Sequence, residues 1–206
     1  MRIGTLGTGR MATTLARLWA GAGHDVLLGS RDPERGRTVA DELDAGVGGG
    51  GQEDAIAHGD VVLLTFPGGE AVRGVSALSF RDGQILVDLT NRVGLDLPAG
   101  DSLAQRVQAA APGTRVVKAF NTIHFKSLAE PVHPGVKAAG PYCGDDAEAR
   151  RVVGELVADA GLDPIDAGPL SQAYLLEHLA LLWIDLAFNR GVGADTAFAL
   201  LRREGA

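Results

Sequence analysis

The stretch "GTGRMA", residues 7–12, has the residue types and the spacing that bind a pyrophosphate. It fits the pattern G-x-G-x-x-G/A, in which the first glycine permits a tight turn, the second lets a phosphate approach the main chain, and a small last residue keeps a helix close to a strand. A helix beginning near Arg10 would add free N–H groups and the positive end of its dipole. The motif predicts a dinucleotide site; a glycine turn without a ligand is the alternative.

Ser30, Arg31 and Arg35 stand where a site for NAD usually has an acidic residue that binds the ribose 2′-hydroxyl. A guanidinium group binds a 2′-phosphate through charge-assisted hydrogen bonds, whereas a carboxylate repels it. The segment therefore predicts selection of NADP(H). The alternative is a surface arginine that pairs with Asp32 or Glu34.

A third segment, "LTFPGGE" (64–70), follows an apolar run and predicts a further contact with the nucleotide. Thr65, Phe66 and Pro67 fall where such folds pass over the ribose and pyrophosphate, and Pro67 stops the strand. A simple turn is the alternative.

Short apolar runs that alternate with amphipathic stretches must position these motifs. We expect strands at 2–7, 25–30, 60–66, 84–90, 115–120, 137–144 and 163–168, and helices at 10–22, 33–44, 69–78, 101–110, 146–160 and 171–189. This alternation predicts an α/β fold: a Rossmann-type, doubly wound, mainly parallel sheet with a small C-terminal helical extension.

We expect one NADP-binding domain over 1–206, in which roughly 169–206 is the extension for dimerisation and the acceptor site. The glycine-rich segment 46–52 is expected to be a flexible loop. A phosphate-binding role is the alternative, which is disfavoured because no strand runs directly into the segment.

Composition narrows the possible partners. The net charge of −7 and the lack of clustered Lys and Arg argue against a nucleic-acid partner. The longest apolar stretch, 175–188, contains three charged or titratable residues, which argues against a membrane span. The first apolar run breaks at Gly7, too early for a signal peptide, and Cys143 is the single cysteine. We expect a cytoplasmic protein.

The chain resembles the NADPH-dependent reductases of coenzyme F420, an 8-hydroxy-5-deazaflavin. The resemblance rests on "GTGRM", "GSRDPER", "LTFP" and the tail "YCGDDAEARRVVGELV…LDPIDAGPLSQAYLLE". It implies NADP(H) as cofactor and coenzyme F420 as co-substrate. The nucleotide contacts that it implies are Gly7, Thr8, Gly9, Arg10 and Met11 at the pyrophosphate, Ser30, Arg31 and Arg35 at the 2′-phosphate, and Thr65, Phe66 and Pro67 at the ribose. It also implies that Leu89, Thr90, Asn121, Thr122 and Ile123 flank the nicotinamide.

Two segments depart from the archaeal members of this family. They have an apolar, proline-containing segment where this chain has "DLTNRV" (88–93), and a histidine where it has Asn121 in "KAFN". The latter form resembles the cytoplasmic domains of metalloreductases. Another acceptor on the same fold, such as a flavin, quinone, imine or ferric chelate, is therefore the first alternative, and a non-catalytic NADP-sensing module is the second.

Hydride transfer between two ring cofactors needs little side-chain chemistry. The candidates for a catalytic role are Asn121 and His124, with a histidine at the solvent edge as the alternative for His124. Lys118 is expected to pair with Asp88 across neighbouring strand ends.

The remaining titratable residues favour structural roles. We expect Cys143 to be a small buried residue, His178 to take part in helix packing, and Asp145 and Asp146 to cap a helix. No metal site is expected.

The last long helix, 171–189, is apolar on almost every side. A helix of that kind needs burial all round, and one sheet face cannot supply it. The pattern predicts a homodimer in which this helix packs against a second subunit.

Overall fold

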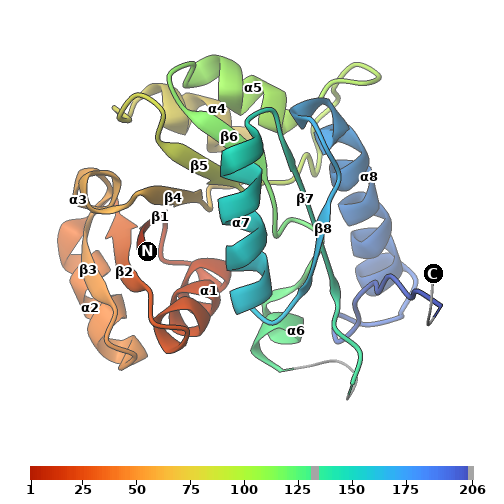
Figure 1. Ribbon diagram of the computed structural model, residues 1–206, viewed down its shortest axis with the longest axis horizontal. Helices are drawn as coiled ribbons and strands as arrows, with labels where there is room; N and C mark the ends of the chain where they lie inside the picture. Colours follow the sequence, from red (N-terminus) through yellow and green to blue (C-terminus); the bar gives the residue numbers. More distant parts are fainter. Residues whose placement is uncertain (131–134, 204–206) are drawn as a thin grey trace.

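The computed structural model describes residues 1–130 and 135–203 of the chain. Strands and helices alternate along it, as the apolar periodicity predicts (Figure 1). The strands are β1 (Arg2–Leu6), β2 (Asp25–Ser30), β3 (Gly48–Gly51), β4 (Val61–Leu64), β5 (Ile85–Asp88), β6 (Arg115–Lys118), β7 (Ala139–Gly144) and β8 (Asp163–Asp166). The α-helices are α1 (Arg10–Gly21), α2 (Pro33–Leu43), α3 (Gln52–His58), α4 (Gly68–Ser76), α5 (Leu103–Ala110), α6 (Phe125–Ala129), α7 (Ala147–Asp159) and α8 (Ala173–Ile184).

The strands form one sheet in the order β3-β2-β1-β4-β5-β6-β7-β8. Every neighbouring pair is parallel except β6 and β7. The chain order reverses between β1 and β4, and ligands of open α/β sheets bind outside the carboxyl ends of the strands at such a switch point. The structure thus confirms the Rossmann-type, mainly parallel fold.

Helices cover both faces of the sheet. One buried cluster joins α1 and α7 to the sheet through residues such as Leu15, Trp19 and Val153. The other joins α4, α5 and α8 to the opposite face through residues such as Val75 and Leu103. Figure 1 shows α7 and α8 on opposite sides of β7 and β8. Burial on both faces explains why β4 and β5 are almost continuously apolar.

The expectation of a flexible loop at 46–52 is wrong. Gly48–Gly51 is the edge strand β3, paired in parallel with β2, and α3 begins directly after it at Gln52. Helix α2 packs so closely on β3 that a Cβ at Gly36 would lie 2.1 Å from the carbonyl oxygen of Gly50. This contact admits no side chain, so the glycines allow a strand that carries no apolar pattern.

The C-terminal segment is only partly helical. A 3₁₀ turn, η1 (Leu170–Gln172), leads into α8, and a π-helical turn, η2 (Asp185–Asn189), follows it. Residues 190–203 form no regular element, but the N–H of Ala139 on β7 donates to the carbonyl of Phe198 at 2.8 Å. In residues 1–130 and 135–203, no helix combines the length and the apolar character that crossing a bilayer requires.

Cys143 and the two aspartates before α7 have structural roles. Cys143 is fully buried in β7, and burial raises the pKa of its thiol to about 12. Asp146 caps α7, because its carboxylate accepts from the N–H of Ala149 at 2.7 Å. Asp145 does not cap that helix; its carboxylate accepts from the N–H of Leu170 at 2.9 Å.

Candidate active site

The turn after β1 brings the main chain into position for a phosphate. Gly7 has a φ of +128°, which favours glycine, and a Cβ there would lie 2.2 Å from Oγ1 of Thr65. The Gly7 N–H donates to the carbonyl of Gly29 at 2.8 Å, which ties the turn to β2. The turn therefore requires glycine at this position, as the motif predicts.

Helix α1 begins at Arg10 with Gly9 as its N-cap, and no side chain caps its first turn. A Cβ at Gly9 would meet nothing within 4 Å, so the main chain there is open to a ligand. The exposed end of α1 offers free N–H groups and the positive end of the helix dipole, which suit a pyrophosphate. The guanidinium of Arg10 lies 5.1 Å from the ring centroid of Phe125, a cation–π contact that holds its side chain beside α6.

A cavity of about 720 Å³ extends from this turn across the carboxyl end of the sheet. Of the predicted nucleotide contacts, Gly7, Thr8, Gly9, Ser30, Arg31, Arg35, Thr65, Phe66 and Pro67 line it. Met11 and Arg10 lie beside it in the first turn of α1. Segments far apart in the sequence thus meet at one cavity, and its donors suit the pyrophosphate and 2′-phosphate of NADP.

Arg31 and Arg35 have no hydrogen bond or ion pair with any residue in the described part of the chain. The two acidic neighbours that were the alternative partners are engaged elsewhere. The carboxylate of Asp32 accepts from the N–H of Glu34 at 3.1 Å and caps α2, and the carboxylate of Glu34 pairs with Arg37 at 2.5 Å. The guanidinium groups of Arg31 and Arg35, which line the cavity, are therefore available to an anion.

Helix α4 supplies a wall of the cavity that the sequence reasoning missed. Glu70, Arg73, Gly74 and Ala77 line it. Their spacing of three, one and three residues places them on one helical face, and this periodicity after "LTFP" was the available signal. The ring of Phe66 packs over Gly74, where a Cβ would lie 2.5 Å from its Cε2 atom.

The predicted nicotinamide contacts form a second group at the carboxyl ends of β5 and β6. These strands are parallel neighbours, so Leu89–Thr90 and Asn121–Ile123 leave the sheet side by side. Leu89 is half-buried, and the other four residues are between 2% and 7% exposed. They do not line the 720 Å³ cavity. The structure thus brings these residues together at one end of the sheet, mostly beneath the surface and outside the lining of the cavity.

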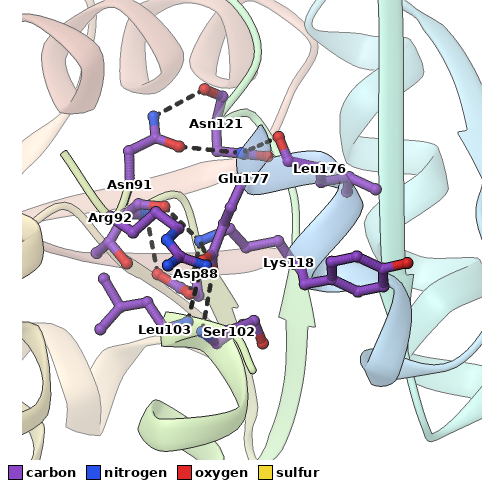
Figure 2. Close-up of polar contacts among 12 residues, drawn as sticks. Asp88, Asn91, Arg92, Ser102, Leu103, Lys118, Asn121, Leu176 and Glu177 are labelled. Carbon is purple, nitrogen blue, oxygen red and sulfur yellow. Dashed lines mark hydrogen bonds and ion pairs between the residues drawn. The ribbon is translucent and has the colours of Figure 1, made fainter. Parts of the chain in front are cut away.

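Two asparagines join the strand ends. The Nδ2 of Asn91 donates to the carbonyl of Asn121 at 2.9 Å, and the Nδ2 of Asn121 donates to Oδ1 of Asn91 at 3.1 Å. Asn121 also donates to the carbonyl of Leu176 on α8 at 3.0 Å. Figure 2 shows this pair above a group of buried charges. Asn121 therefore links both strand ends to the C-terminal helix.

Within the residues that the structure describes, three buried side-chain atoms have no hydrogen-bond partner: Oγ1 of Thr90, Oδ1 of Asn121 and Nδ1 of His124. All three follow β5 or β6. Unpaired polar atoms are costly in a protein interior, and such groups gather at functional sites. Phe120, between β6 and Asn121, has a φ of +60°, which is strained for an aromatic residue. The strand ends therefore carry strain and unused polar groups.

His124 lies in an aromatic group. Its ring is stacked with Trp183 at a centroid distance of 5.7 Å and lies 4.2 Å from the ring of Phe125. Burial lowers the pKa of His124, and the charge of Lys126 lowers it further. A neutral imidazole is therefore favoured at neutral pH. His178 on α8 was expected to take part in helix packing, but it is exposed, and its Nδ1 hydrogen-bonds the carbonyl of Tyr174 on the same helix.

Lys118 pairs with Asp88 at 3.0 Å between Nζ and Oδ2, as the sequence predicts. The structure adds a third charge that the sequence reasoning missed: Oε1 of Glu177 lies 3.2 Å from the same Nζ. All three side chains are fully buried. Glu177 stands in a largely apolar helix, and a buried position for a charged residue there was the signal for a buried partner.

Comparisons with known proteins identify the family of the chain. Residues 2–92 match the family model described as NADP oxidoreductase, coenzyme F420-dependent. The F420-dependent NADP reductase of Methanothermobacter thermautotrophicus is 32% identical over 217 residues, which covers 93% of this chain and 91% of that protein. The metalloreductase STEAP3 of Rattus norvegicus is 30% identical over 181 residues, which covers 87% of this chain. The chain spans only 36% of the length of that metalloreductase.

A crystal structure from Arthrobacter sp. FB24, of a protein described as an F420-dependent NADP reductase, has the same fold. It is 28% identical, its TM-score is 0.83, and the match covers 98% of this chain and 100% of that one. The fold, the cavity with its free arginines and the full-length similarity agree with one another. The chain therefore belongs to the family of coenzyme F420-dependent NADP oxidoreductases and is an NADP-dependent oxidoreductase.

Proposed function

We propose that the chain transfers hydride between NADPH and a deazaflavin of the coenzyme F420 type. The observation that carries this proposal is similarity to the archaeal reductase along 93% of the chain. The family model ends at residue 92, within the nucleotide-binding half. The similarity to the archaeal protein continues through β6, β7 and α8, where we expect the acceptor side.

The chemistry of the cavity supports the nucleotide half of this proposal. Bound NADPH would supply the hydride. The first turn of α1 would hold the pyrophosphate through N–H groups, and Arg31 and Arg35 would hold the 2′-phosphate through charge-assisted hydrogen bonds. Thr65 and Phe66 would contact the ribose. These residues orient the nucleotide along the switch point of the sheet.

The acceptor side would exclude water and support the nicotinamide. Its wall contains apolar surface and a few neutral polar groups, from Thr90, Asn121 and Ile123. A stacked pair of rings needs such a surface and no proton relay, since the two rings supply the reactivity. Neutral His124 and the indole of Trp183 would extend the apolar surface next to Phe125.

A second candidate keeps NADPH and changes the acceptor to a flavin, a quinone, an imine or a ferric chelate. The reciprocal hydrogen bonds of Asn91 and Asn121 favour it, because they make the wall more polar than a deazaflavin requires. The similarity to a protein named a metalloreductase supports the same alternative.

The test is a panel of acceptors. Purified protein is mixed with NADPH and oxidised coenzyme F420, and the visible absorbance of the deazaflavin is followed. FMN, FAD, a quinone, a cyclic imine and a ferric chelate are run in parallel. Loss of the deazaflavin absorbance at a rate well above that of the other acceptors would support the proposal. Turnover of another acceptor without reduction of the deazaflavin would refute it, and turnover of none would favour an NADP-sensing module.

A further inference from the structure

Three charged side chains from separate elements meet beneath the carboxyl ends of β5 and β6 (Figure 2). Nζ of Lys118 on β6 lies 3.0 Å from Oδ2 of Asp88 on β5 and 3.2 Å from Oε1 of Glu177 on α8. The same ammonium group donates a hydrogen bond to the carbonyl of Thr90. The ammonium group therefore has two hydrogen-bond acceptors and a second carboxylate within ion-pair distance, although the side chain is inaccessible to solvent.

The second negative charge of this triad has its own compensation. Glu177 accepts from the N–H groups of Leu103 at 3.1 Å and Ala104 at 3.2 Å, in the first turn of α5. A carboxylate is favoured at a helix N-terminus by the helix dipole and by the free N–H groups there. Glu177 thus connects α8 to α5 as well as to Lys118.

Stability alone is a weak explanation for such a triad. Removing charges from water is unfavourable, and well-packed apolar side chains often replace a buried ion pair without loss of stability. The contacts that the triad makes with the main chain are more informative, because they are confined to particular peptide groups.

Both peptide groups of Thr90 are bound by the triad. Oδ1 of Asp88 accepts from the Thr90 N–H at 2.8 Å, and Lys118 donates to the Thr90 carbonyl. On α8, the residue before Glu177 is Leu176, whose carbonyl accepts from Asn121 at 3.0 Å. One turn of α8 therefore contacts both the triad and the end of β6.

From these contacts we infer that Lys118, Asp88 and Glu177 form a positioning network for hydride transfer. This inference rests on the proposed function. The three residues touch neither nucleotide nor acceptor; they hold Thr90 directly and Asn121 through Leu176, the neighbour of Glu177, and Thr90 and Asn121 would support the nicotinamide. Hydride transfer requires the two rings at contact distance, and a displacement of about 1 Å far from the chemistry can slow a reaction roughly 100-fold.

The experiment compares Lys118→Met with Val153→Ala. Methionine keeps much of the length of the lysine side chain and removes its charge and donors. Val153 is fully buried on α7, in the cluster on the other face of the sheet, so its truncation weakens the core without removing a charge or a hydrogen bond of the triad. Each variant is measured at a temperature at which its melting curve shows it to be folded.

Three readouts separate positioning from general damage. The affinity for adenosine 2′,5′-bisphosphate reports the half of the site at Arg31 and Arg35. The affinity for NADPH and the fluorescence of its bound nicotinamide report how firmly the ring is held. Single-turnover reduction of coenzyme F420 reports the transfer step.

For Lys118→Met we expect affinity for the bisphosphate within about two-fold of wild type, reduced enhancement of nicotinamide fluorescence, and hydride transfer slower by roughly 100-fold. Val153→Ala should keep wild-type values in all three. Equal fluorescence enhancement and equal transfer rates in the two variants would overturn the inference. So would a parallel loss of bisphosphate and NADPH affinity in folded Lys118→Met.

If Lys118→Met does not fold, Glu177→Gln provides the second test. Glutamine keeps the side-chain volume and one oxygen for α5, and removes the charge facing Lys118. We expect the same pattern with transfer slower by about 10-fold, and wild-type fluorescence together with wild-type transfer would overturn the inference. If wild-type protein does not reduce coenzyme F420, the proposed function fails, yet the bisphosphate and fluorescence comparisons still test the network.

Discussion

Replacing Arg31 with alanine removes one of two guanidinium groups that line the nucleotide cavity at the end of β2. Within the described chain neither Arg31 nor Arg35 has an ion pair, so binding a 2′-phosphate breaks no existing contact. Asp32 and Glu34 would compete for these arginines, but they cap α2 and pair with Arg37. The free arginines therefore predict a preference for NADPH over NADH.

A charge-assisted hydrogen bond contributes roughly 1.5–3 kcal/mol, which corresponds to about 10- to 100-fold in affinity. Arg31 and Arg35 are both exposed, and salt screens exposed charges, so the lower end of this range applies. We expect Arg31→Ala to weaken NADPH binding about 10-fold and to leave NADH binding within about two-fold.

The assay is a titration of each variant with both nucleotides at two salt concentrations, and binding is measured by calorimetry or nucleotide fluorescence. Arg37→Ala is the matched control, because Arg37 is a nearby arginine on α2 that pairs with Glu34 and does not line the cavity. The loss for Arg31→Ala should shrink at higher salt, whereas the control should bind as wild type does. An equal loss for NADPH and NADH, or no loss for NADPH, would refute this reasoning.

Leu175 and Leu182 on α8 are 48% and 51% exposed, so we expect wild-type protein to be a homodimer at micromolar concentration. Light scattering should show a monomer for Leu182→Glu, and a monomeric wild type would refute the prediction. Gly36→Ala should lower the free energy of unfolding by about 1–3 kcal/mol, because the new Cβ would lie 2.1 Å from the carbonyl oxygen of Gly50. A urea titration in which the variant is as stable as wild type, or more stable, would contradict this contact. Cys143 should react with a disulfide reagent only after the protein unfolds, because its thiol is fully buried and has a pKa raised to about 12; fast labelling of native protein at pH 8 would argue against that burial.

The homodimer prediction needs one correction from the structure. The sequence predicts a helix that is apolar on almost every side. In the structure, however, Trp183 on α8 is only 7% exposed, and its Nε1 donates to the carbonyl of Thr196 at 3.1 Å. The C-terminal segment therefore covers part of the helix that a second subunit was expected to cover. The exposed apolar residues Leu175, Leu182 and Phe188 remain for a partner.

Local sequence determined the features of this protein whose physical cause lies within a few residues. The glycines of "GTGRMA" allow the turn after β1, the apolar runs form buried parallel strands, and Asp146 caps α7. Ser30, Arg31 and Arg35 could be assigned to one site because their distance from the glycine motif is set by one βαβ unit.

Only the tertiary structure revealed features that depend on contacts between distant segments. β3 has no side-chain signal, since its glycines are required by the close approach of α2 and its pairing with β2 uses main-chain groups alone. Glu177 lies 59 residues after Lys118 in the sequence, and no helical or strand periodicity relates two positions so far apart. Its place beside Lys118 follows from the packing of α8 against α5, because the sheet and both helices must be assembled before the three charges can meet.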